Sequence, residues 1–186
     1  LATWTAACGP VIYRGDQYPA AMVGDAFIPE PSGNMIRHQR ITWKADGMPD
    51  ARNAYDKAEW LTSTDERFRP VNMYNGPDGC LYIVDMYRGI LQHKVYVTSF
   101  LRKQIIERKL DAPIGLGRIY RVVHTGQKPK QSPKVSAQKS SQLVAHLESD
   151  NGWLRSTAHR LLVQQADAKA TPQLRETATH SESHLA

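Results

Sequence analysis

The fold class is decided by the stretch Phe68-Arg69-Pro70-Val71-Asn72-Met73-Tyr74-Asn75-Gly76-Pro77-Asp78-Gly79-Cys80-Leu81-Tyr82-Ile83-Val84. Its first half, Phe68 to Tyr74, reads as a strand that leads into Gly76-Pro77-Asp78-Gly79, residues that favour a turn. The second half, Cys80 to Val84, is rich in β-branched and aromatic residues, as strands are. The stretch therefore predicts two strands joined by a turn.

Similar patterns lie on both sides of this stretch. Asp25 to Pro29 and Met35 to Ile41 flank a turn, Gly117 to Val123 is typical of a last strand, and Asp46 to Asp56 is expected to be a surface loop. One segment, Thr98 to Lys109, has apolar residues at helical spacing and predicts a helix over the sheet. Residues 1–123 suit the C-terminal blades of a β-propeller, since one blade takes about 40–45 residues.

The pattern changes after residue 123. Residues 124–141 are rich in Lys, Gln, Ser and Pro and predict a basic, extended and mobile linker. Residues 142–186 have helical periodicity, broken by short turns, which is typical of the start of a HEAT-like repeat. The predicted fold class is mainly β with C-terminal α, a partial β-propeller followed by the start of an α-helical repeat. We expect the chain to be a piece of a longer protein.

The net charge of +6 does not predict nucleic-acid binding. Much of the excess lies in the linker, at Lys128, Lys130, Lys134 and Lys139, and no basic face studded with aromatic residues accompanies it. No stretch approaches the roughly 20 apolar residues that span a bilayer, so we expect no membrane span.

The densest group of charged residues is Asp65-Glu66-Arg67-Phe68-Arg69. If Arg67 and Arg69 begin a strand, its period of two places both guanidinium groups on one face and turns Phe68 to the other. Two neighbouring cations need an anion, and arginine holds carboxylates or phosphates by paired hydrogen bonds. The alternative is that nearby acidic residues of this chain, such as Asp85, pair with them.

Several motifs in order give a resemblance to a known family. They are Cys8-Gly9-Pro10-Val11-Ile12-Tyr13-Arg14-Gly15-Asp16, Phe27-Ile28-Pro29-Glu30-Pro31-Ser32-Gly33-Asn34, Phe68-Arg69-Pro70-Val71-Asn72, Gly76-Pro77-Asp78-Gly79 and Asp85-Met86-Tyr87-Arg88-Gly89. Residues 8–123 thereby resemble the membrane-bound dehydrogenases abundant in planctomycetes, relatives of sorbosone dehydrogenase and of the soluble quinoprotein glucose dehydrogenases.

The resemblance implies a six-bladed propeller that binds pyrroloquinoline quinone (PQQ), usually with Ca²⁺. It also implies oxidation of a sugar or polyol by hydride transfer to the quinone, a cytochrome c as electron acceptor, and a periplasmic or cell-surface location. Arg67 and Arg69 match the arginines that contact the PQQ carboxylates. The family's catalytic histidine and Ca²⁺ loop belong to earlier blades, so no catalytic residue or metal ligand is assigned.

Two hypotheses follow for the function. The first is a fragment of a PQQ-type dehydrogenase, inactive alone. The second is a non-catalytic propeller-plus-repeat module that binds carbohydrate or protein. The second is favoured by the absence of lysine near Gly33-Asn34, where the family has its cofactor lysine. His180 and His184 have a spacing that can bind metal on a helix, but a tail segment is the preferred interpretation.

Overall fold

The computed structural model describes residues 4–128 and 130–181, which divide into two compact units. The first unit takes in the described residues up to Tyr13, then Gly24–Tyr74 and Tyr82–Val122. The second takes in Arg14–Val23, Asn75–Leu81 and the described residues from Val123 onward. This division differs from the predicted ranges 1–123, 124–141 and 142–186, because two segments of the β-rich part belong to the unit that holds the linker and helices.

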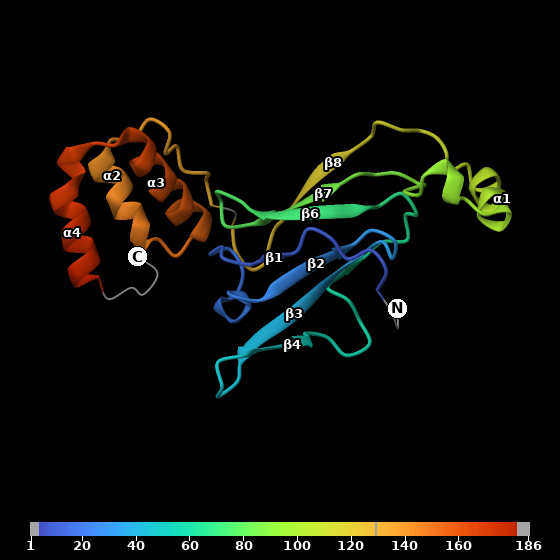
Figure 1. Ribbon diagram of the computed structural model, residues 1–186, viewed down its shortest axis with the longest axis horizontal. Coiled ribbons are helices and arrows are strands. Elements are labelled where there is room, and N and C mark those ends of the chain that lie inside the picture. The colour runs from blue at the N-terminus through green and yellow to red at the C-terminus, as the bar shows by residue number, and fades with distance from the viewer. Residues whose placement is uncertain (1–3, 129, 182–186) are drawn as a thin grey trace. The chain divides into compact units, whose positions relative to one another are not determined.

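The first sheet of unit 1 is antiparallel, with strand order β1-β2-β3-β4 and β5 paired to β3 (Figure 1). Its core residues come from β2 and β3, where Phe27 and Ile36 are fully buried. One strand was not predicted, since β4 lies within the expected surface loop 46–56 and pairs with β3 from Gln39 to Trp43. The strands are β1 Val11–Ile12, β2 Ala26–Glu30, β3 Met35–Trp43, β4 Pro49–Asn53 and β5 Leu61–Thr62.

The second sheet has the order β6-β7-β8, with β6 Pro70–Asn75, β7 Leu81–Asp85 and β8 Arg118–Val122. The predicted strand pair and its turn are confirmed, because the Gly76 N–H donates to the Cys80 carbonyl at 2.8 Å. Helix α1, Ser99–Glu107, is also confirmed, and its N-cap Thr98 accepts a hydrogen bond from the Leu101 N–H. The helix lies past the end of β6 and β7, not over the sheet as predicted, and Ile105 is its buried residue (Figure 1).

The helices of unit 2 are α2 Ser140–Ala145, α3 Gly152–Gln165 and α4 Thr171–His180. Asn151 caps α3 by accepting hydrogen bonds from the Trp153 and Leu154 N–H groups. The core of this helical part contains Val135, Leu143, Leu154 and Ala158, with Leu147, Trp153, Leu161 and Leu162 packed around it. Val135, which the sequence places in the linker, is thus a core residue.

The linker that we expected to be extended and mobile is fixed at its start by Gln17. This side chain is fully buried, and its amide donates to Gln127 Oε1 and to the Lys128 carbonyl, both at 3.3 Å. Its oxygen accepts a hydrogen bond from the Lys130 N–H at 3.2 Å, and Lys130 forms an ion pair with Asp16. Because an amide satisfies both its donor and its acceptor here, Gln17 fixes the linker without an unpaired buried group.

The fold class is therefore mainly β with C-terminal helices, as predicted. Over residues 4–128 and 130–181 both sheets are open, and no closed barrel or propeller is present. In the same residues no helix combines the length and apolar character that a bilayer crossing requires.

Candidate functional site

The segment with the two predicted site arginines is a turn rather than a strand. Asp65 accepts a hydrogen bond from the Arg67 N–H at 2.9 Å, and the Phe68 N–H donates to the Asp65 carbonyl at 3.0 Å. Strand β6 begins only at Pro70, so the period of two does not apply to Arg67 and Arg69. Phe68 is buried, as expected, against the ring of Tyr120. The two guanidinium groups consequently have different partners.

Arg69 donates to three backbone carbonyls. Its Nε bonds to the Arg88 carbonyl at 2.8 Å, one terminal nitrogen to the Gly89 carbonyl at 2.9 Å, and the other to the Pro31 carbonyl at 2.7 Å. Burial lowers the pKa of its guanidinium, and the nearby carboxylates of Glu66 and Asp85 oppose this shift. Arg69 therefore joins the β2–β3 turn to the segment after β7.

The backbone of Arg69 is held as firmly as its side chain. The buried carboxylate of Asp85 accepts hydrogen bonds from the Arg69 N–H at 2.7 Å and from the Tyr87 N–H at 2.8 Å. The Arg69 carbonyl accepts from the Met86 N–H at 2.9 Å. Asp85 thus pairs with the backbone at Arg69, while a longer ion pair of 3.8 Å joins it to Arg118.

Arg67 makes the second set of carbonyl contacts. One terminal nitrogen donates to the Lys109 carbonyl at 2.6 Å and to the Ala112 carbonyl at 2.9 Å. These carbonyls lie just after α1, where helical carbonyls lack partners within the helix. The Arg67 Nε is buried and has no hydrogen-bond partner among the described residues.

These contacts test whether the residues fit a PQQ carboxylate. Each nitrogen of the Arg69 guanidinium already donates to a backbone oxygen, so a carboxylate would have only the second N–H of each terminal nitrogen. Arg67 leaves its Nε without a partner, but that nitrogen is buried. Asn34, near which the resemblance would place a cofactor lysine, donates its amide to the Phe68 carbonyl at 2.6 Å. The contacts that Arg69 already makes and the position of Asn34 disfavour a quinone carboxylate at this turn.

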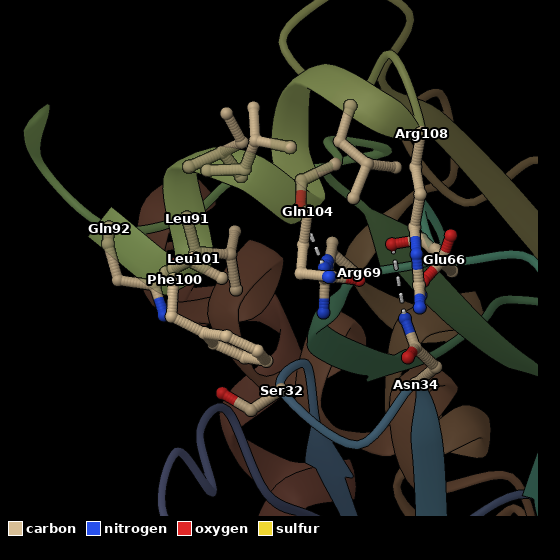
Figure 2. A pocket seen from close by; sticks show the side chains of 14 residues that line it. Ser32, Asn34, Glu66, Arg69, Leu91, Gln92, Phe100, Leu101, Gln104 and Arg108 are labelled. Atoms are coloured by element: carbon tan, nitrogen blue, oxygen red, sulfur yellow. Dashed lines mark hydrogen bonds and ion pairs between the residues drawn. The ribbon is translucent and has the colours of Figure 1, made fainter. Parts of the chain in front are cut away.

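Arg69, but not Arg67, borders a cavity of about 410 Å³ beside α1 (Figure 2). This volume falls in the range of small-molecule sites, about 300–1,000 Å³. Figure 2 shows Arg69 and Gln104 between a side that carries Phe100 and Ser32 and a side that carries Glu66 and Arg108. The lining also includes Asn34, Gln92, Leu101 and the segment Gly89–Leu91.

The cavity contains polar groups that the chain itself does not use. The side chains of Ser32, Gln92 and Gln104 form no hydrogen bond with other groups in the described part of the chain, whereas Glu66 and Arg108 form an ion pair. Phe100 leaves 73% of its surface exposed. Amides and a hydroxyl both donate and accept, so the cavity presents hydrogen-bonding groups of both kinds beside an aromatic ring.

The sequence analysis did not find this cavity. Phe100 and Gln104 lie four residues apart on α1, and this spacing places them on one helix face. That signal was visible, but Phe100 was interpreted only as part of an apolar helix face, and Gln104 was given no role. No group of three potential metal ligands occurs in the described residues, and His184 lies outside them.

Asp65 is expected to titrate below its ordinary pKa. The Arg67 N–H donates to its carboxylate, which lowers the pKa of Asp65, and a hydrogen bond from Tyr87 lowers it further. A lowered pKa in the folded state means that ionised Asp65 stabilises the fold above about pH 4, and that this stabilisation is lost as the pH falls further. An NMR titration of the carboxyl carbon should give a midpoint below about 3.9. A midpoint at or above this value would contradict the turn geometry.

The chain is mainly β, with C-terminal helices and a small cavity, lined partly by polar side chains, beside helix α1. Residues 1–126 match the model of a family described as a domain of unknown function, DUF7133. The match spans well over half of the 186 residues, and the chain belongs to this family. No curated protein and no solved structure matches the chain.

Proposed function

We propose that this chain is a non-catalytic binding module whose cavity beside α1 takes a neutral, hydroxyl-rich ligand, a sugar or a polyol. The observation that carries the proposal is the set of uncommitted hydrogen-bonding groups at Ser32, Gln92 and Gln104, beside the exposed ring of Phe100. Sugar hydroxyls need partners that donate and accept, and the apolar face of a sugar ring packs on an aromatic side chain.

A neutral ligand is favoured because the cations of the cavity already have partners. Arg108 pairs with Glu66, and Arg69 donates to three carbonyls. An anion would have to compete with these contacts for the same guanidinium groups, and each lost hydrogen bond to a charged group costs about 1.5–3 kcal/mol. A sugar leaves them in place.

The finer architecture belongs to the same proposal. We place the two open sheets in a β-propeller as neighbouring blades and α2 to α4 at the start of a HEAT-like array. The antiparallel meander β1 to β4 and the short, capped helices support this assignment. In such a protein the cavity would be one ligand site of a larger surface.

The test is a titration of the isotope-labelled 186-residue chain with glucose and, separately, with sorbitol, followed by amide shifts. We expect saturable shifts at Ser32, Gln92 and Phe100–Gln104. At about 0.1 M sugar a site with a Kd near 1 mM, about −4.1 kcal/mol, is saturated. Gln104→Leu should weaken binding about tenfold, the effect of one lost hydrogen bond of about 1.4 kcal/mol.

Ile106→Ala is the matched control for this titration. Ile106 is also on α1 and is 66% exposed, but it borders a neighbouring groove and not this cavity. Its replacement should leave the sugar affinity unchanged. If neither glucose nor sorbitol shifts the cavity amides at about 0.1 M, a concentration far above a millimolar Kd, the proposal fails.

The second candidate is the quinone-dependent dehydrogenase fragment. One observation favours it, the buried Arg67 Nε without a partner, whose N–H can donate to a carboxylate oxygen. Titration of the chain with PQQ in the presence of Ca²⁺, followed by the quinone absorbance, separates the candidates. If PQQ causes a saturable absorbance change, and Arg67→Ala abolishes it, the dehydrogenase fragment is favoured over the sugar-binding module.

A further inference from the structure

We propose that Arg67 and Arg69 are positioning residues that hold the walls of the α1 cavity through five backbone carbonyls. The inference rests on the proposed function, because the walls that they fix are those of the proposed sugar site. It assigns these residues a different role from the quinone contact that the resemblance implies.

The wall formed by the segment after β7 depends on Arg69. Its guanidinium reaches the carbonyls of Arg88 and Gly89, directly before the lining residues Ile90, Leu91 and Gln92. The same group reaches the Pro31 carbonyl, directly before the lining residue Ser32. One planar group therefore fixes two segments that contribute to the lining, and only arginine has donors in this fork geometry.

The wall formed by α1 depends on Arg67. Its contacts with the Lys109 and Ala112 carbonyls hold the chain at the C-terminal end of α1. This end lies next to the lining residues Arg108 and Leu110. Arg67 and Arg69 are separated only by Phe68, so one short turn controls both walls.

The two walls meet at Gly89, which shows how tightly they are held. A Cβ atom added at Gly89 would lie 2.3 Å from the Leu110 carbonyl oxygen and 2.8 Å from the Leu110 Cα. Glycine permits this close approach of two backbones because it has no Cβ atom. The Arg69 contact at Gly89 and the Arg67 contact at Lys109 lie on the two sides of this approach.

The experiment compares Arg69→Lys and Arg67→Lys with the full-length wild-type chain by amide hydrogen exchange and by the glucose titration. Lysine keeps the charge but is a point donor, so it cannot reach several carbonyls in one plane. We expect the Met86 amide, which donates to Arg69, to exchange about tenfold faster in Arg69→Lys, and the Leu110 amide to do so in Arg67→Lys. The glucose affinity should fall about tenfold in each.

Arg40→Lys is the matched control, since Arg40 is exposed on β3 and its side chain has no hydrogen bond or ion pair in the described part. A second variant separates positioning from a general loss of stability. In Arg69→Ala, millimolar guanidinium chloride should restore glucose binding and slow the Met86 exchange, whereas equal sodium chloride should not.

Two results would overturn the inference. One is unchanged exchange at Met86 and Leu110 in the lysine variants. The other is PQQ binding by the wild type that either lysine variant abolishes. Failure of the sugar proposal looks different, because exchange would still respond to both variants while no form of the chain bound glucose or sorbitol.

Discussion

Replacing Phe27 by alanine is expected to lower the free energy of unfolding by about 3–5 kcal/mol, the usual cost of removing a buried aromatic side chain. Phe27 is fully buried in β2. Its ring stacks on His38 with centroids 4.6 Å apart and meets the edges of Trp60 and Tyr13 at 4.8 and 6.4 Å. Three aromatic neighbours cannot close such a cavity without moving β3. Urea denaturation measures the loss.

The same substitution at Phe100 is the control. Phe100 lies on the exposed side of α1, so its removal should change the free energy of unfolding by no more than about 0.5 kcal/mol. It should instead weaken glucose binding, because its ring borders the proposed site. A Phe27→Ala variant as stable as Phe100→Ala would show that the sheet is not packed on Phe27.

Gly89→Ala is expected to have the second large effect. The added methyl group meets the backbone of Leu110, which cannot turn away as a flexible side chain could. Overpacking of this kind costs about 1–3 kcal/mol, and the walls of the cavity must separate to relieve it. We expect a lower unfolding midpoint in urea together with a weaker glucose affinity.

Gly117→Ala is the matched control for this variant. At Gly117 the nearest atoms to an added Cβ are the Asp85 and Met86 carbonyl oxygens, at 3.6 and 3.8 Å, which is ordinary contact. Its free energy of unfolding should stay within about 0.5 kcal/mol of the wild type. If Gly89→Ala behaves like Gly117→Ala in both measurements, the close approach at Leu110 does not exist in solution.

Local signals account for what could be predicted of the fold. The turn 76–79 between two apolar runs predicts the β6–β7 pair, and Thr98 marks the start of α1 within one residue. Strand β4 was missed because its sequence, Pro-Asp-Ala-Arg-Asn, is polar, and its pairing with β3 supplies the order.

The site could be predicted only in part. The spacing of Arg67 and Arg69 drew attention to this turn, but a guanidinium group donates to any oxygen within reach. The oxygens that it found belong to residues up to 45 positions away in the sequence, such as Ala112. Backbone carbonyls have no sequence signature. An arginine that binds a cofactor therefore cannot be distinguished, from the sequence alone, from one that donates to backbone carbonyls.

The composition of unit 2 bears on how this chain can be divided. Helix α3 begins where the Gly152 N–H donates to the Arg14 carbonyl at 2.6 Å and where the Asn151 amide donates to the Pro77 carbonyl at 3.0 Å. A fragment that starts at residue 142 has neither acceptor. We therefore expect the helical segment to be less stable when it is expressed without the rest of unit 2. Its contact with Pro77 joins residues more than 70 positions apart in the chain, and contacts of such long range form slowly.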